Sequence, residues 1–142
     1  MSKSFLKVNP ANEVTIRKNG SDEKSLLVRA LLGGTFGTDS IETLKTWARQ
    51  LGAAIQTASE SIDKKPICVL IDISTFELYT DPQVVTVLVN LMKTDNPFVH
   101  KTATFGGRTD LEMIENIIKG FAGRDNLRNF KTEAEALAWL SA

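Results

Sequence analysis

The sequence predicts an α/β fold, a single layer of mostly parallel β-sheet with helices, in the order β-β-α-β-α-β-α-β-α. Two observations predict this class. Apolar residues recur every three or four positions in several segments, which is the period of an amphipathic helix. These segments alternate with short β-branched runs that are typical of buried strands. Such alternation favours parallel strands joined by right-handed crossovers, and 142 residues are enough for one domain with its own core.

The N-terminal region predicts a hairpin preceded by an arm. Residues 1–12 are polar and without periodicity, so we expect a loose arm followed by a single domain over residues 13–142. Residues 13–18 alternate in polarity, and Asn19-Gly20 follows them, a pair that tolerates positive φ and favours a hairpin turn. Residues 25–32 are apolar on both faces, as in a central strand. The hairpin would therefore add one antiparallel strand at an edge of the sheet.

The remaining elements follow from periodicity and caps. Helices are predicted over residues 39–59, 83–93, 109–121 and 132–140, and strands over 66–73, 98–105 and 127–130. The pairs Asp39/Glu42, Thr109/Glu112 and Thr132/Glu135 have the spacing of helix N-terminal capping boxes. Pro82 is suited to the first position of its helix, with Asp81 before it as the cap.

Composition excludes several classes of function. Seventeen basic and seventeen acidic side chains give zero net charge, which argues against nucleic acid or a charged membrane surface as the main partner. One cysteine and one histidine supply neither an internal disulfide nor a closed zinc site. We therefore expect no metal and no cofactor. The sequence has no apolar run long enough for a signal peptide or a transmembrane segment, so we expect a cytoplasmic location.

The residues with reactive side chains do not form a catalytic pattern. Cys68 lies inside an apolar strand, and His100 lies on another strand, so both favour structural roles. Gly33, Gly34 and Gly37 stand between a strand and a helix, but their spacing matches no phosphate-binding motif and favours a turn or bulge. We therefore predict no catalytic residues.

Two local features could serve binding. Asp72, Glu77 and Asp81 are three carboxylates close together in the sequence, with no Lys or Arg between them. The Val-rich helix over residues 83–93 has an apolar stripe that favours core packing, and Val85 and Val89 lie off that stripe. Surplus apolar residues of this kind leave a face for a ligand or a partner.

With these elements placed, the pattern resembles the STAS domain family, named for sulphate transporters and anti-sigma factor antagonists. The stand-alone SpoIIAA-like branch is the most similar. The resemblance covers roughly residues 13–141, and the order and spacing of four stretches carry it: residues 28–36, 68–74, 75–84 and 129–140. It implies binding and regulation rather than catalysis. It also implies that residues 75–84 form the loop into the next helix.

The family's phosphorylation switch is altered in this chain. In anti-sigma factor antagonists, a partner kinase phosphorylates a serine at the start of the helix after the central strand. The resemblance places Asp81 at that position, after Thr80. Asp81 would supply a fixed negative charge there, and Thr80 or Ser74 would remain as alternative acceptors. The same branch is associated with apolar or lipid-like ligands.

Two hypotheses of function follow. The first is a non-enzymatic regulatory module that binds a protein through residues 74–84, namely Ser74, Glu77, Tyr79, Thr80 and Asp81. The alternative is a carrier or sensor of a small apolar ligand beside the 83–93 helix, contacting Val84, Val85, Leu88 and Met92. An enzyme ranks third, because it would need a cleft that joins His100 or Cys68 to the carboxylates. The sequence leaves the choice between monomer and homodimer open.

Overall fold

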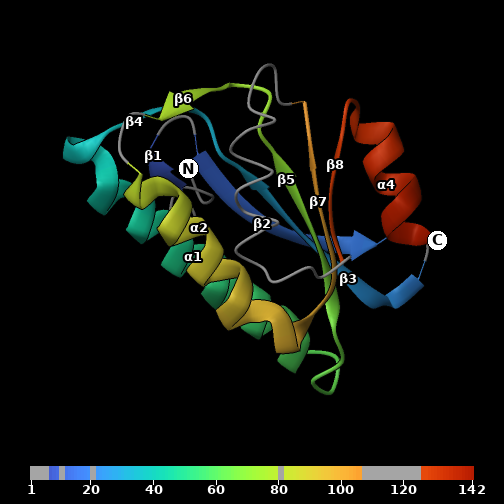
Figure 1. The fold of residues 1–142 in the computed structure, drawn as a ribbon. Helices are drawn as coiled ribbons and strands as arrows, with labels where there is room; N and C mark the ends of the chain where they lie inside the picture. The colour runs from blue at the N-terminus through green and yellow to red at the C-terminus, as the bar shows by residue number, and fades with distance from the viewer. Residues whose placement is uncertain (1–6, 10–11, 20–21, 80–81, 107–125) are drawn as a thin grey trace.

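The computed structural model has the predicted α/β architecture (Figure 1) and describes residues 7–9, 12–19, 22–79, 82–106 and 126–142. Its main sheet has six strands in the order β1-β2-β3-β5-β7-β8. The last four strands in this order are parallel, and β1 and β2 extend the sheet as antiparallel strands at one edge. The strands are β1 (Lys7–Asn9), β2 (Asn12–Asn19), β3 (Asp22–Leu31), β5 (Ile67–Asp72), β7 (Val99–Phe105) and β8 (Leu127–Phe130).

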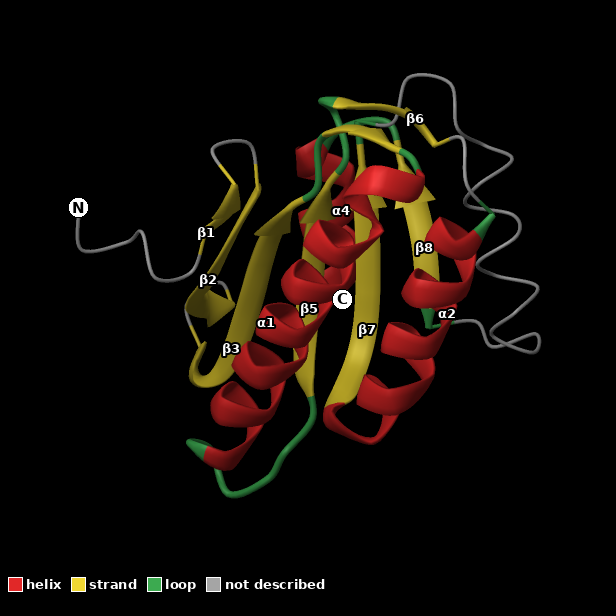
Figure 2. Cartoon of the chain, turned by 90° about the vertical axis from the view of Figure 1, so that its left-hand side faces the viewer, coloured by secondary structure: helices red, strands yellow, loops and turns green. Residues whose placement is uncertain are grey.

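Helices cover both faces of this sheet. Helices α1 (Ile41–Glu60) and α2 (Gln83–Asp95) lie side by side on one face, and α4 (Glu133–Ser141) lies on the other (Figure 2). Short 3-10 helices, η2 (Thr38–Ser40) and η3 (Asn96–Phe98), adjoin α1 and α2. Within the described part of the chain, no helix has the length and apolar character needed to cross a bilayer.

The strands distribute their side chains between two hydrophobic clusters, as a period of two requires. Val28 and Val69 belong to the larger cluster beneath α1 and α2. Leu70 and Ala103 belong to the smaller cluster beneath α4. Because both faces of the central strands are apolar, the sheet is stable only when helices cover both sides.

The segment predicted as a loop contains a strand. Strand β6 (Phe76–Tyr79) pairs in parallel with β4 (Gly34–Phe36) in a separate two-stranded sheet. This corrects the expectation of a loop over residues 75–84, whereas the pairing shifts register between Gly34 and Thr35, as the expectation of a turn or bulge at the glycines allows. A Cβ on Gly33 would collide with Thr75 Oγ1, so the absence of a side chain permits this close approach. Segments of three and four residues have too little periodicity to predict such a distant pairing.

Part of the segment predicted as an N-terminal arm forms a strand. Residues expected in the arm form β1, which pairs with β2 through Lys7↔Glu13 and Asn9↔Asn12. The predicted hairpin is confirmed by the register Asn19↔Asp22, although Gly20 itself is outside the described residues. The helix predicted over residues 109–121 also lies outside them.

The predicted helix caps have different outcomes. Thr132 Oγ1 accepts a hydrogen bond of 3.2 Å from the Glu135 N–H, as its capping box predicts. Asp39 does not cap α1, because it lies within η2, and Ser40 precedes the helix. Pro82 has helical backbone angles directly before α2, and Asp81, the predicted cap, is outside the described residues.

Trp47 joins α1 to the sheet. Its side chain is fully buried in the larger cluster, and its Nε1–H donates a hydrogen bond of 3.1 Å to the carbonyl oxygen of Leu31, at the end of β3. The indole therefore contributes both apolar area and a donor for a strand carbonyl.

We expect Trp47→Phe to lower the free energy of unfolding by about 1–3 kcal/mol, because the Leu31 carbonyl loses its donor and the ring leaves a void. Urea denaturation measures the change. Trp139→Phe on the half-buried face of α4 is the control and should cost less. Equal losses from the two substitutions would contradict a special role for the Trp47 hydrogen bond.

Candidate functional site

A groove of about 520 Å³ lies between α1 and α2. Small residues of α1 create it: Ala48, Gly52 and Ala53 line one wall, where larger side chains would close the gap between the helices. Val87 and Leu91 of α2 line the other wall. The groove thus has apolar walls and a size typical of small-molecule sites.

Polar and charged groups border these apolar walls. Gln56, Asn90 and Thr94 are among the lining residues, and Lys45 and Arg49 add positive charge nearer the start of α1. Lys45 Nζ lies 3.4 Å from Glu42 Oε2, and Arg49 donates a hydrogen bond of 3.1 Å to Thr46 Oγ1. This combination suits an amphipathic ligand rather than a purely apolar one.

Asp95 also lines the groove, and it is a costly residue for this position. The side chain is only 3% exposed, and its Oδ2 has no hydrogen-bond partner among the described residues. As the last residue of α2, Asp95 places a negative charge at the unfavourable end of the helix dipole. Burial raises the pKa of this carboxyl from its ordinary value of 3.8 to about 6.

Gly52 provides the space for this carboxylate. A Cβ at Gly52 would lie 3.4 Å from Asp95 Oδ1 and 3.6 Å from Oδ2. The carboxylate therefore packs against the backbone of α1 at a point where no side chain separates the two helices.

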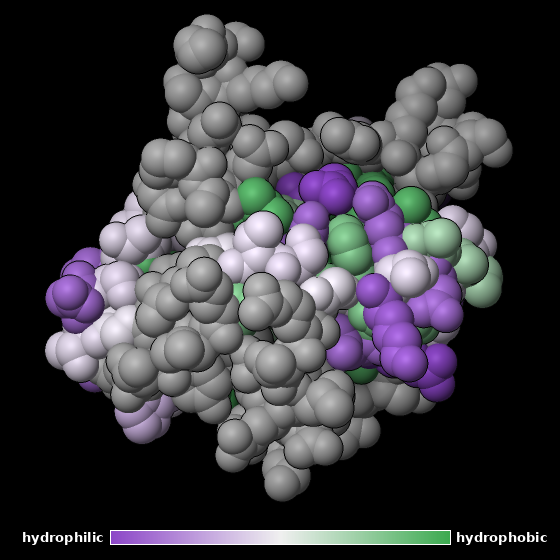
Figure 3. Space-filling view, turned by 90° about the horizontal axis from the view of Figure 1, so that it is seen from above, coloured by the Kyte–Doolittle hydropathy of each residue, from purple (hydrophilic) through white to green (hydrophobic). Residues whose placement is uncertain are grey.

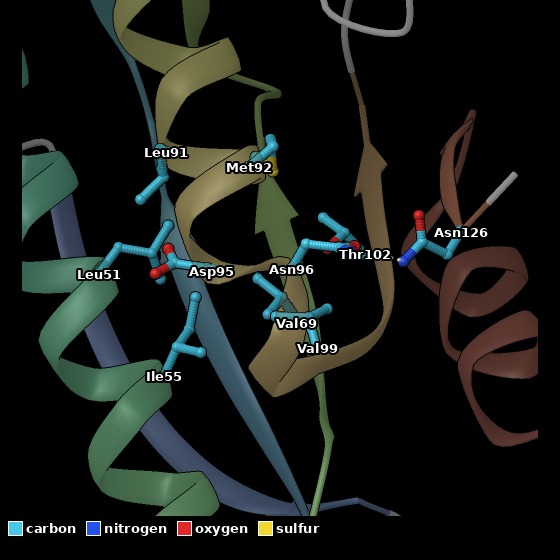
Figure 4. Close-up of a pocket in the computed structure, with 10 residues that line it drawn as sticks. All are labelled: Leu51, Ile55, Val69, Leu91, Met92, Asp95, Asn96, Val99, Thr102 and Asn126. Carbon is cyan, nitrogen blue, oxygen red and sulfur yellow. Dashed lines mark hydrogen bonds between the residues drawn. The ribbon is translucent and has the colours of Figure 1, made fainter. Parts of the chain in front are cut away.

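A second, much smaller cavity lies on the inner side of Asp95. Its volume is about 10 Å³, close to that of one water molecule. Figure 4 shows the carboxylate turned toward α1 between Leu51 and Ile55, with Asn126 on the far side of the cavity. Asn126 Nδ2 donates a hydrogen bond of 3.2 Å to Asn96 Oδ1, and Asn126 Oδ1 has no partner among the described residues. Asp95 thus borders both an internal cavity and the open groove.

Residues 74–84, the segment predicted to bind a partner, begin at the carboxyl ends of the parallel strands. Figure 3 shows this end of the molecule from above. Ser74 is exposed, and both its N–H and its Oγ donate to Asp72 Oδ1, at 2.8 and 2.6 Å. Asp72 Oδ2 in turn lies 3.7 Å from Arg29, which lies 3.4 Å from Glu133. Asp72 is therefore paired with a basic residue from a strand distant in sequence.

The other residues of that predicted surface are less fully described. Glu77 and Tyr79 belong to β6, and only their backbone is described. Thr80 and Asp81 lie outside the described residues. The structure therefore brings Ser74 and Asp72 together and leaves the remainder of the predicted partner surface as a prediction.

The predicted apolar contacts do not line the groove. Val84, Leu88 and Met92 are buried in the core beneath α2, and Val85 is half-buried against the same cluster. The stripe of α2 faces the sheet, whereas the groove lies at its flank, beside α1. The sequence signal that could have indicated the groove is the run of small residues at positions 48, 52 and 53 of α1.

Cys68 and His100 lie in different environments. Cys68 is buried in the cluster beneath α4, and burial raises the pKa of its thiol. His100 is exposed and borders a shallow recess of about 300 Å³ with Arg128. In the same recess, Lys101 Nζ donates a hydrogen bond of 2.7 Å to the Trp139 carbonyl. Among the described residues, no three His, Cys, Asp or Glu side chains form a cluster able to hold a metal ion.

Comparisons with known proteins add no assignment. No protein-family model matches the chain, and none of the curated proteins compared with it shows significant similarity.

We expect Asp95→Asn to raise the free energy of unfolding at pH 7.5 by about 2–3 kcal/mol, because the amide avoids burial of a charge. The native state of the wild type binds the Asp95 proton more tightly than the unfolded state does. Wild-type stability should therefore fall as the pH rises from about 4 to about 6 and then level off. Urea denaturation across this range measures the difference.

Asp63→Asn is the matched control, because Asp63 is an exposed carboxylate in the turn after α1. Asn tolerates the positive φ of this position. The control variant should keep the wild-type difference in stability between pH 4 and pH 6. If Asp95→Asn also keeps that difference, burial of the Asp95 carboxylate does not cause the pH dependence, and the prediction is wrong.

Proposed function

We propose that the chain is a non-enzymatic binding module that holds a small amphipathic ligand in the groove between α1 and α2. The observation that carries this proposal is the groove itself, about 520 Å³ in volume, with apolar walls and a polar rim. Ligand sites in proteins have this size and this combination of surfaces. The resemblance to STAS domains, with their regulatory and ligand-binding roles, also supports a binding function.

The packing of the two helices supports a site rather than an accidental gap. Neighbouring helices on a sheet normally fill the space between them with interlocking side chains. Here Ala53 is exposed and Val87 is only half-buried, so part of both walls is accessible to a ligand. Apolar surface left uncovered beside polar groups is characteristic of binding sites.

We expect a ten-carbon amphiphile to bind the purified chain and Ala53→Trp to abolish the binding, because an indole at this position would fill the groove. Decanol, decanoic acid and decylamine serve as probes, and isothermal titration calorimetry measures their affinities at concentrations where each is dissolved as a monomer. Thr57→Trp is the control, since Thr57 is an exposed residue of α1 that does not line the groove. The proposal fails if no probe binds or if Ala53→Trp binds like the wild type.

A second candidate function is recognition of a protein partner through residues 74–84. The observation that favours it is Ser74, an exposed hydroxyl that donates to Asp72 at the start of this segment. A phosphoryl group on Ser74 would place about two negative charges beside Asp72 and would disrupt this hydrogen bond. Ser74 therefore offers a modification point at the surface that the sequence predicts.

We expect Asp81→Lys to reduce capture of a specific partner from lysate of the native host at least fivefold, because it reverses the charge of the predicted surface. Glu60→Lys makes the same charge change at the far end of α1 and should capture the partner like the wild type. Quantitative mass spectrometry of the captured proteins compares the three baits. Equal recovery with Asp81→Lys and with the wild type would remove this surface.

A further inference from the structure

Asp95 has the burial and position of a group that requires a partner from outside the chain. A buried charge is normally paired, and a buried polar atom without a hydrogen bond calls for a specific explanation. Asp95 is 3% exposed, and its Oδ2 has no partner among the described residues. Its place at the C-terminal end of α2 adds a further cost from the helix dipole. No contribution to stability accounts for a carboxylate in this position.

The charged groups around Asp95 do not neutralise it. On α1, Gly52 lies directly against the carboxylate. Arg49 and Lys45 are three and seven residues earlier on that helix, or about 4.5 and 10 Å along its axis. Arg49 donates to Thr46, and Lys45 lies beside Glu42. On α2, Lys93 is exposed, and Asp95 forms no ion pair within the described part of the chain.

We infer that the ligand of the groove carries a protonated amine that donates to the Asp95 carboxylate, with its apolar chain along Ala53 and Val87. This inference rests on the proposed function. An ammonium group supplies both the hydrogen-bond donor and the opposite charge that the carboxylate lacks, and such charge-assisted bonds are the strong ones. Because Gly52 has no side chain, no Cβ at this position of α1 stands against the carboxylate.

The rest of the groove selects among amines. Its walls are apolar at Ala48, Ala53 and Val87, so they fit a hydrocarbon chain. Lys45 lies toward the other end and would repel a second ammonium group. The ligand class is therefore an amphiphile with a single amine head rather than a polyamine.

Calorimetry at pH 7.5 with decylamine, decanol and decanoic acid, each below its solubility limit and any micelle concentration, tests this inference on the full chain. We expect decylamine to bind the wild type at least tenfold more tightly than decanol or decanoic acid. In Asp95→Asn this preference over decanol should fall below twofold. The preference should also weaken in the wild type as the pH is lowered through about 6, where Asp95 takes up a proton.

Two further variants keep the result interpretable. Asp63→Asn removes a negative charge from the exposed turn after α1 and should retain the preference for decylamine. Gly52→Ala brings a methyl group to 3.4 Å from Asp95 Oδ1 and should weaken decylamine binding more than decanol binding. 1,10-Diaminodecane should bind at least fivefold more weakly than decylamine, and equal binding would overturn the exclusion of polyamines.

The outcomes separate this inference from the function on which it rests. Equal binding of decylamine and decanol to the wild type, or a preference that survives in Asp95→Asn, overturns the role of Asp95 and leaves the groove as a ligand site. Tighter binding of decanoic acid than of decylamine would also overturn the role of Asp95 and leave the groove as a ligand site. The head group would then bind Arg49 and Lys45. Absence of binding by all of these probes overturns both the inference and the proposed function.

Discussion

Strand β5 (Ile67–Asp72) imposes the constraint on which the rest of the structure depends. It pairs in parallel with β3 on one side and β7 on the other, and its first five residues are fully buried. Val69 packs beneath α1 and α2, and Leu70 packs beneath α4. A strand that is apolar on both faces needs a helix layer on each side. The crossovers that supply α1 and α2 on the same face follow from this requirement and from right-handed connection of parallel strands.

The groove results from the distribution of large and small side chains in the helix layer that α1 and α2 form. Trp47 and the large aliphatic residues of α1 point toward the sheet, where they provide most of the stabilising burial. The flank of α1 that faces α2 instead carries Gly52 and Ala53, so the two helices meet over the core and separate above it. The stabilising apolar contacts therefore lie between the helices and the sheet, and the space between the two helices is not filled by side chains. Asp95 lies where these two regions meet.

The sequence predicts those parts of the fold whose signal is local. The boundaries of β8 follow from the sequence alone, and α2 is predicted despite its many valines because it is too long for a typical strand. The pairing of β4 with β6 is not local, and neither segment has a period that reveals it. The groove between α1 and α2 is harder to predict from the sequence than the strand pairing. Val87 and Val84 have the same side chain, and only the position of α1 decides that one lines the groove and the other the core.

The sheet topology is consistent with a candidate site at the Asp95 carboxylate, between α1 and α2, rather than at the carboxyl ends of the strands. In open α/β sheets, ligands bind beyond the carboxyl ends of the strands where the strand order reverses direction. The parallel strands described here, β3, β5, β7 and β8, follow one another in a single direction without reversal. At their carboxyl ends Arg29 lies near both Asp72 and Glu133 and 5.8 Å from the ring centre of Phe105, so a positive charge faces these two carboxylates. The groove instead retains a buried carboxylate without such compensation, and this contrast is the reason that we propose the groove as the ligand site.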